Sequence, residues 1–322
     1  MDIEYLLTLQ NFRADIGDTL TPAMEWISMA ATTYLILIPV FWYWNRNKNQ
    51  GLYALVSYYF CMFLTPVIKL TACIYRPWIR DARVLPAGDS IRTATGYSFP
   101  SGHTTTCGPL AGGMAVNTWK DKRTCVLSVL FIVFVLLTGF SRNYLGVHTP
   151  QDVLTALLIS VLSLYGTARL FSYLERHPER EDWFLLGGFI LCWAAIAYIS
   201  LKSYPMQYDH EGGKLIVDPE KMKVDGYGDI GKVIGFIVAR YIEKTWIRFR
   251  PRRSSWVQVI LCLLGLIPMV LMKTYFRPVM RGWLGDQWGS MAYNVLFTFY
   301  YIALFPLVLK ITGKFTGKRA EA

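Results

Sequence analysis

Charged residues are scarce in this sequence. Only 17% of the 322 residues are Asp, Glu, Lys or Arg, compared with about 25% in soluble globular proteins. Hydrophobic residues make up 53% of the chain, and its mean hydropathy is positive. This composition excludes an intrinsically disordered chain, and it argues against an ordinary soluble globular protein.

Cysteines and acidic residues are also few. Six cysteines, scattered in or beside apolar segments, indicate neither a disulfide framework nor a metal cluster, so we expect them to be small packing residues. The 22 Asp and Glu residues are outnumbered by 33 Lys and Arg residues, which gives a net charge of +11. In a soluble protein this excess would suggest a nucleic-acid surface. Here the basic residues lie between long apolar segments, so we expect membrane lipids as partners and no nucleic acid.

Long segments without charge are abundant. About 20 apolar residues are needed to cross a bilayer as a helix, and eight segments approach this length. They are residues 26–44, 51–68, 101–119, 124–141, 153–168, 183–201, 254–272 and 287–309. The fifth reaches full length if it begins at Thr149. No soluble core needs so many such segments, and the sequence therefore predicts an all-α fold, a polytopic membrane helical bundle.

A ninth segment, residues 230–247, is more polar, and its hydropathy alone would make it an amphipathic surface helix. Four arginines follow it between Arg248 and Arg253, and basic loops stay in the cytoplasm. Nine spans with an external N-terminus place this cluster, the other basic loops and the C-terminus on one side, which we expect to be cytoplasmic. The loops at 71–100 and 202–229 then face the extracytoplasmic side, meaning the periplasm, the exterior or a lumen.

We therefore divide the chain into a six-span core, residues 1–201, and an extension, residues 202–322. The extension contains an extracytoplasmic loop and three further spans. Polar residues within or at the ends of membrane spans are costly to bury and usually functional. Three clusters of such residues occur, and all three lie in the core.

The first cluster, Lys69-Leu-Thr-Ala-Cys-Ile-Tyr-Arg76-Pro77, closes the second span. On a continuous helix Lys69 and Arg76 would share one face, about 10 Å apart along the axis, and Pro77 would end the helix. Two cations on one face can converge on a single anion. The alternative is that both are interfacial anchors whose charged ends reach toward water.

The second cluster, Ser98-Phe-Pro-Ser101-Gly102-His103, opens the third span. We predict Ser101 as the helix N-cap and His103 in the first turn. Gly102 would let an anion approach the free backbone amides at the positive end of the helix dipole. The alternative is an ordinary cap beside an interfacial histidine.

The third cluster runs from Ser141-Arg142 through His148 to Asp152 and joins the fourth and fifth spans. Thr149 is predicted to cap the fifth helix, with Pro150 at its first position. Asp152 can then be the acid of a capping box. Alternatively, it can hydrogen-bond one ring nitrogen of His148 and leave the other nitrogen as a nucleophile.

All three clusters must lie on the same membrane face, because they end or begin successive spans. Three cations (Lys69, Arg76 and Arg142), two histidines and one carboxylate would then converge. Fixed positive donors suit a phosphoryl group, and a histidine beside a carboxylate together with a second histidine suits covalent catalysis with leaving-group protonation. No set of residues has metal-ligand spacing, so we expect no catalytic metal and no cofactor.

These clusters resemble the three motifs of the type-2 phosphatidic acid phosphatase family, which shares its site with vanadium haloperoxidases. The family pattern is Lys, six residues, Arg-Pro; then Pro-Ser-Gly-His; then Ser-Arg, five residues, His, three residues, Asp. The chain matches this pattern in residue types, spacing and order, from Lys69 to Asp152. The likeness covers roughly residues 26–201.

The resemblance implies a role for each residue. His148 would attack phosphorus, Asp152 would orient it, and His103 would protonate the leaving oxygen. Water would then hydrolyse the phosphohistidine without a metal. The residues that would hold the phosphate are Lys69, Arg76, Ser101, Gly102 and Arg142.

The leading hypothesis is therefore a membrane phosphatase that acts on a lipid phosphate monoester or diphosphate. Two alternatives keep the same site: a phosphatase for a soluble sugar phosphate, similar to the nine-span glucose-6-phosphatase branch, and a lipid phosphotransferase. A third is a non-enzymatic binder or transporter of lipid phosphates. The sequence does not name the lipid or the oligomeric state.

Overall fold

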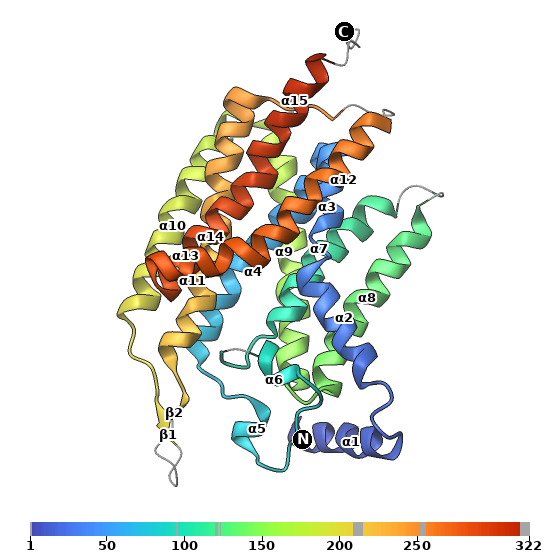
Figure 1. Cartoon of the computed structure of the whole chain (residues 1–322), viewed down its shortest axis with the longest axis vertical. Helices are drawn as coiled ribbons and strands as arrows, with labels where there is room; N and C mark the ends of the chain where they lie inside the picture. Colours follow the sequence, from blue (N-terminus) through green and yellow to red (C-terminus); the bar gives the residue numbers. More distant parts are fainter. Residues whose placement is uncertain are drawn as a thin grey trace.

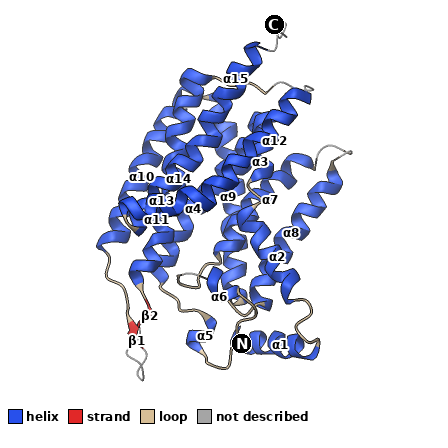
Figure 2. Ribbon diagram, in the orientation of Figure 1, coloured by secondary structure: helices blue, strands red, loops and turns tan. Residues whose placement is uncertain are grey.

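Long helices make up almost all of the protein. The computed structural model describes residues 2–94, 96–119, 122, 124–208, 215–251 and 256–315. The helices run roughly side by side in one bundle (Figure 1, Figure 2). The predicted all-α fold is confirmed, with one addition in the loop after residue 201. This is a short antiparallel hairpin of β1 (Gln207–Tyr208) and β2 (Leu215–Val217).

The helices range from single turns to full membrane length. In chain order they are α1 (Asp2–Asp15), α2 (Thr21–Thr33), α3 (Leu37–Asn45), α4 (Lys48–Ala72), α5 (Pro77–Arg80), α6 (Ser90–Thr93), α7 (Gly102–Thr118), α8 (Cys125–Tyr144), α9 (Pro150–Arg176), α10 (Glu181–Leu201), α11 (Pro219–Ile242), α12 (Trp256–Leu271), α13 (Arg277–Leu284), α14 (Asp286–Phe299) and α15 (Phe305–Phe315). Short 3-10 or π-helical segments lie at Pro178–Arg180, Glu243–Ile247, Met272–Phe276 and Tyr300–Leu304.

Six helical stretches are long and apolar enough to cross a membrane. They are Lys48–Arg80, Cys125–Tyr144, Pro150–Arg176, Pro178–Leu201, Trp256–Leu284 and Asp286–Gly313. Helices α2 and α3 meet at 41° and make a seventh if the bent pair is one span. These stretches account for all the predicted long segments except residues 101–119. The protein is therefore an integral membrane protein.

The two remaining predicted spans are α7 and α11. α7 is only 17 residues long, and α11 carries several charged residues. Two of these charges are paired: Lys232 lies 2.7 Å from Asp229, and Arg240 lies 2.8 Å from Glu181. α11 packs against α4, α10 and α14 and is largely buried, so the alternative of a surface helix is wrong. The total of nine crossings stays a prediction.

Two glycines let α11 approach α14 closely. In Gly231-Lys-Val-Ile-Gly235 they lie about one turn apart on one face, a spacing typical of close helix pairs in membranes. A Cβ added at Gly231 would lie 2.7 Å from the carbonyl oxygen of Met291. At Gly235 it would lie 2.6 Å from the carbonyl oxygen of Val295. The contact therefore depends on the absence of a side chain at both positions.

The helices after residue 201 pack directly against the core. The Tyr43 hydroxyl donates to the Ile302 carbonyl at 3.1 Å, and the Trp44 indole nitrogen donates to the Tyr301 carbonyl at 2.8 Å. The hydroxyls of Tyr59 and Tyr301 lie 2.5 Å apart. Buried side chains from both parts form one continuous hydrophobic core. The division at residue 201 stays a prediction from sequence.

The three predicted clusters lie at the end of the bundle that also holds α1 (Figure 1). Backbone hydrogen bonds join them: Ser98 N donates to the carbonyl of Ile74 at 2.7 Å, and Ser101 N donates to the carbonyl of Asp152 at 3.1 Å. These bonds tie the segment after α4 to the start of α7, and the start of α7 to the start of α9. The clusters therefore share one end of the bundle, as predicted.

Replacing Gly231 by Ala is expected to destabilise the protein by about 1–3 kcal/mol, because the new Cβ would be forced against the backbone of α14. Gly187→Ala in α10 is the matched control, since a Cβ there meets nothing within 4 Å. Thermal unfolding in detergent measures both variants. Equal unfolding temperatures for the two would contradict the close α11–α14 contact.

Candidate active site

The first cluster departs from the predicted continuous helix. α4 ends at Ala72, and its C-cap Cys73 is left-handed, with φ of 51°. Arg76 is extended, as residues before proline usually are, and Pro77 begins α5 instead of ending α4. The prediction that Lys69 and Arg76 share one helix face is therefore wrong, because a break in the helix separates them.

Lys69 and Arg76 nevertheless hold the same segment. Lys69 Nζ donates to the carbonyls of Tyr97 at 2.7 Å and Pro100 at 2.9 Å. Arg76 Nε donates to the carbonyl of Gly96 at 3.0 Å. Two cations from opposite sides of the helix break thus position residues 96–100, the loop that leads into α7. Their charges are held inside the protein, since Arg76 is only 4% exposed and Lys69 is half-buried.

The second cluster forms at the start of α7. Ser101 is the N-cap and His103 lies in the first turn, as predicted. The Ser101 side chain makes no capping hydrogen bond, and its Oγ accepts one from Thr104 Oγ1 at 3.0 Å instead. A Cβ added at Gly102 would meet nothing within 4 Å. The space in front of the first helical amides is therefore open to an anion.

Asp152 makes both of the contacts considered for it, the helix cap and the approach to His148, while the nucleophilic role of the other ring nitrogen stays a prediction. Thr149 caps α9, with Pro150 at the first position, and Asp152 completes the capping box. Asp152 Oδ2 accepts from the Thr149 amide at 2.8 Å and also lies 3.3 Å from His148 Nδ1. The helix cap therefore fixes the carboxylate that orients the imidazole ring. His148 and Asp152 are both buried, so the pair is shielded from water.

The partners of His148 define its tautomer. A guanidinium can only donate and a carboxylate can only accept. Arg76 Nη1 lies 2.8 Å from Nε2, and Asp152 Oδ2 lies on the Nδ1 side. The neutral ring therefore carries its proton on Nδ1 and its lone pair on Nε2. Nε2 is the nitrogen that can act as a nucleophile.

His148 lies between α8 and α9, in a buried and positively charged setting. Burial, together with the positive charge of Arg76, holds the pKa of His148 well below its usual range, and the hydrogen bond to Asp152 only partly opposes this effect. The imidazole is therefore neutral at neutral pH. Its Nε2 lone pair is available without prior loss of a proton.

Arg142, near the end of α8, is a buried cation with unused donors. It is 1% exposed, and Nη1 donates to Ser28 Oγ at 2.5 Å. Its Nε and Nη2 are buried and have no hydrogen-bond partner in the described part of the chain. Buried donors are normally satisfied, and a charged one without a partner is costly. The arrangement favours an anion as the missing acceptor.

His103 joins the same group of charges. The charges of Arg142, Arg76 and Lys69 and the ring of His148 all act on it. The structure thus gathers the residues singled out in the sequence at one end of the bundle, and their chemical roles stay predictions. Within the described ranges, no three His, Cys, Asp or Glu side chains are arranged to hold a metal ion.

Two further residues belong to this network. Ser98 Oγ donates to Asp152 Oδ2 at 2.5 Å and lies 3.4 Å from His148 Nδ1. Asn143 Nδ2 donates to the His148 carbonyl at 2.9 Å. Ser98 opens the second cluster and Asn143 follows Arg142 in the third, but no spacing rule distinguishes them from other polar neighbours. Only the fold shows that Ser98 contacts the His–Asp pair.

Comparison with known proteins identifies this region. Residues 50–176 match the PAP2 superfamily. The match contains every residue of the three clusters and confirms the resemblance inferred from their spacing. It ends at the last residue of α9, so α10 to α15 lie outside the PAP2 region.

Several similar curated proteins are named as phosphatases. The chain is 27% identical over 135 residues to the undecaprenyl-diphosphatase BcrC of Bacillus subtilis, covering 41% of this chain and 65% of that protein. It is 38% identical over 66 residues to the phosphatidylglycerophosphatase B of Escherichia coli, covering 20% and 26%. It is 24% identical over 212 residues to the lipid phosphate phosphatase delta of Arabidopsis thaliana, covering 63% and 49%.

These alignments span less than two thirds of each relative. No solved structure is significantly similar to the chain.

Replacing Ser98 by Ala is expected to lower kcat/KM for phosphate-ester hydrolysis about tenfold, which corresponds to the loss of one hydrogen bond to a charged group. Without the Ser98 hydroxyl, more negative charge on Asp152 faces His148. The pKa of His148 then rises, so the acidic limb of the kcat/KM profile moves to higher pH.

Ser90→Ala is the matched control, because Ser90 is equally buried but its Oγ has no partner among the described residues. A structural role alone would not move the pH profile. A Ser98→Ala variant with the rate and profile of the Ser90→Ala control would contradict a positioning role for Ser98.

Proposed function

We propose that the protein is a membrane phosphatase that hydrolyses a lipid phosphate monoester or diphosphate through a phosphohistidine, without a metal. His148 is the nucleophile, Asp152 orients it and His103 is the general acid. Lys69, Arg76, Ser101, the Gly102 amide and Arg142 form the phosphate site. The observation that carries the proposal is the buried guanidinium of Arg142 with two unused donors beside a neutral His148 held by Asp152.

Phosphate binding would release the nucleophile. In the structure Arg76 Nη1 occupies the lone-pair side of His148 Nε2. A phosphate oxygen is an anionic acceptor and competes well for a guanidinium donor. Arg76 can thus turn its donor to the phosphate, and Nε2 is then free to face phosphorus. Arg142 and the amides at the start of α7 complete the set of positive donors around the equatorial oxygens.

The first step forms a bond between Nε2 and phosphorus and breaks the bond between phosphorus and the leaving oxygen. His103 takes up a proton from the bound phosphate monoester, whose negative charge offsets the surrounding cations, and gives it to that oxygen, so the lipid leaves as an alcohol, or as a monophosphate if the substrate is a diphosphate. Asp152 accepts from Nδ1–H and stabilises the positive charge that develops on the ring.

The second step transfers the phosphoryl group to water. His103, now neutral, takes a proton from the attacking water as a general base. Oxygen bonds to phosphorus, the bond to Nε2 breaks, and inorganic phosphate leaves. Both histidines return to their starting states, so the cycle balances with no metal and no redox partner.

A lipid substrate is supported by the position of the site and by the relatives. The site lies at the ends of membrane-length helices, near the level of lipid headgroups, where a tail can remain in the bilayer. The curated relatives are named for undecaprenyl diphosphate, phosphatidylglycerophosphate and lipid phosphates. These names favour a lipid over a soluble sugar phosphate.

We further propose an extracytoplasmic site, an external N-terminus and a cytoplasmic C-terminus, with residues 1–201 as the catalytic core. The support is charge asymmetry. The end of the bundle opposite the site carries Arg46, Arg176, Arg180 and Arg248 near the helix termini, and basic loops remain in the cytoplasm.

The direct test is a panel of lipid phosphates and soluble sugar phosphates, assayed with purified protein in detergent and excess EDTA. We expect release of phosphate from lipid substrates, inhibition by vanadate, and a loss of at least about 1,000-fold in His148→Ala, because that variant lacks the nucleophile. His177→Ala is the matched control, since His177 is exposed at the opposite end and its loss should leave the rate unchanged.

The panel separates the proposal from its alternatives. Full dependence on a divalent metal would contradict the mechanism. Equal turnover of short soluble substrates would contradict the lipid substrate. Unchanged phosphate release in His148→Ala would contradict the assignment of the nucleophile.

A further inference from the structure

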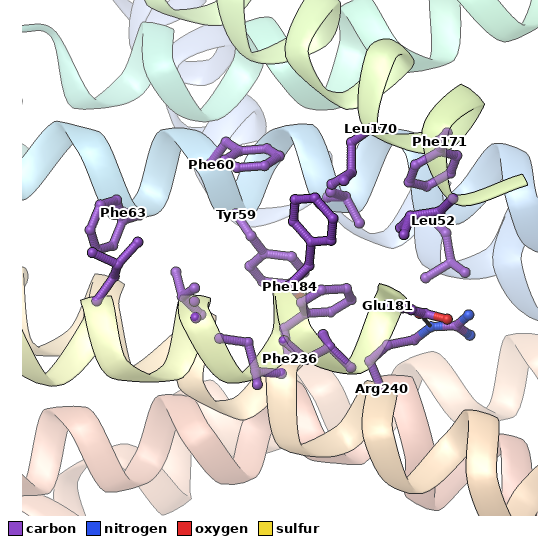
Figure 3. Close-up of a pocket in the computed structure, with 18 of the residues that line it drawn as sticks. Leu52, Tyr59, Phe60, Phe63, Leu170, Phe171, Glu181, Phe184, Phe236 and Arg240 are labelled. Carbon is purple, nitrogen blue, oxygen red and sulfur yellow. Dashed lines mark hydrogen bonds and ion pairs between the residues drawn. The ribbon is translucent and has the colours of Figure 1, made fainter. Parts of the chain in front are cut away.

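A large apolar cavity lies apart from the candidate active site. It has a volume of about 800 Å³ and is a partly open space lined by α4, α9, α10 and α11. Figure 3 shows its aromatic lining, with Phe60, Phe184 and Phe236 turned toward the same space and the Glu181–Arg240 pair at one end. Volumes of this size are typical of ligand sites. Two of its four walls, α10 and α11, lie outside the PAP2 region.

The cavity does not lead to the phosphate site. Along α4 it extends from Asn49 to Leu64, and it ends before Lys69. Between the cavity and the phosphate site, α11 packs tightly on α4, since a Cβ at Gly226 would lie 3.0 Å from Leu70 and 3.5 Å from Pro66. The cavity is therefore a separate feature that lies nearer the opposite end of the bundle.

A second cavity of about 630 Å³ adjoins the first along α9. The two share four lining residues, Phe60, Leu64, Leu170 and Phe184. Apolar side chains therefore face two adjoining spaces on either side of this shared wall. The apolar part of the first cavity, from Leu52 to Leu64 on α4, spans about 18 Å of helix, slightly more than half of a hydrocarbon core about 30 Å thick. Each space thus suits an acyl chain from one leaflet.

The second cavity also contains two arginines. Arg169 and Arg176 are seven residues apart on α9, so they share a face about 10 Å long. No carboxylate of the described chain lies within ion-pair distance of either one, while Arg240, the cation that lines the first cavity, is paired with Glu181. Arg169 is exposed and lies two turns inside a membrane-length helix, so its charge is most favourable beside an anion or in the headgroup layer.

We propose that this double groove binds one anionic two-chain phospholipid from the leaflet opposite the active site. The headgroup phosphate contacts Arg169 and Arg176, one chain lies against Leu162 and Leu64, and the other enters the cavity beside Phe184 and Phe236. Basic pockets between membrane helices are suited to anionic headgroups. The groove gives α10 and α11 a role apart from the phosphate chemistry, as walls of a structural or regulatory lipid site.

The test uses the full chain in nanodiscs of phosphatidylglycerol or phosphatidylcholine, followed by gentle extraction and native mass spectrometry. We expect one phosphatidylglycerol molecule to remain bound, with affinity about tenfold or more above that for phosphatidylcholine. The double variant Arg169→Gln, Arg176→Gln should lose this preference. Arg180→Gln is the matched control, because Arg180 is exposed at the same end but lines neither cavity.

A second variant tests the chain site independently of charge. A Cβ at Gly187 meets nothing within 4 Å, and this residue lines the larger cavity, so Gly187→Trp should fill the space without breaking the fold and should reduce bound phosphatidylglycerol. Size-exclusion profiles verify that each variant is folded. Equal binding of both lipids, or retention of phosphatidylglycerol by the double arginine variant at the level of Arg180→Gln, would overturn the proposal.

Discussion

The carboxylate of Asp152 is the group on which the candidate site depends. Its Oδ2 accepts from the Thr149 amide and the Ser98 hydroxyl, and it lies within hydrogen-bonding distance of His148 Nδ1. These donors come from the cap of α9, from the loop before α7 and from the candidate nucleophile. The main-chain carbonyl of Asp152 also accepts from Ser101 N. One residue therefore sets the start of two helices and the tautomer of the imidazole.

Positive charge is concentrated around this carboxylate at a high desolvation cost. Arg76 and Lys69 meet part of that cost by donating to carbonyls of the 96–100 loop, which makes the loop depend on the cations. Arg142 lacks such compensation on two of its nitrogens within the described chain. Preorganised donors in a site without water stabilise an oxyanion without having to reorganise. The unfavourable free energy of burying these cations is therefore the physical basis for binding phosphate.

The sequence predicted the fold class, most span positions and the gathering of the motif residues, because apolar length and motif spacing are local signals. It was wrong about Lys69 and Arg76 on one helix, since a left-handed Cys73 and the extended residue before Pro77 end α4 early. The sequence left open whether Asp152 caps a helix or orients His148. In the structure the same carboxylate caps α9 and contacts His148. The Ser98 contact, the Gly231 approach and the groove along Arg169 depend on packing between distant segments, which spacing alone does not encode.

The central claim, that His148 Nε2 carries the phosphoryl group, is tested most directly by rapid acid-free quenching of the enzyme with ³²P-labelled lipid phosphate. The account predicts a labelled phosphohistidine at residue 148 in the native protein, with more label in His103→Ala when the substrate has an activated leaving group, because the second step then lacks its base. Single-turnover release of phosphate with no label on His148 at any time would contradict it.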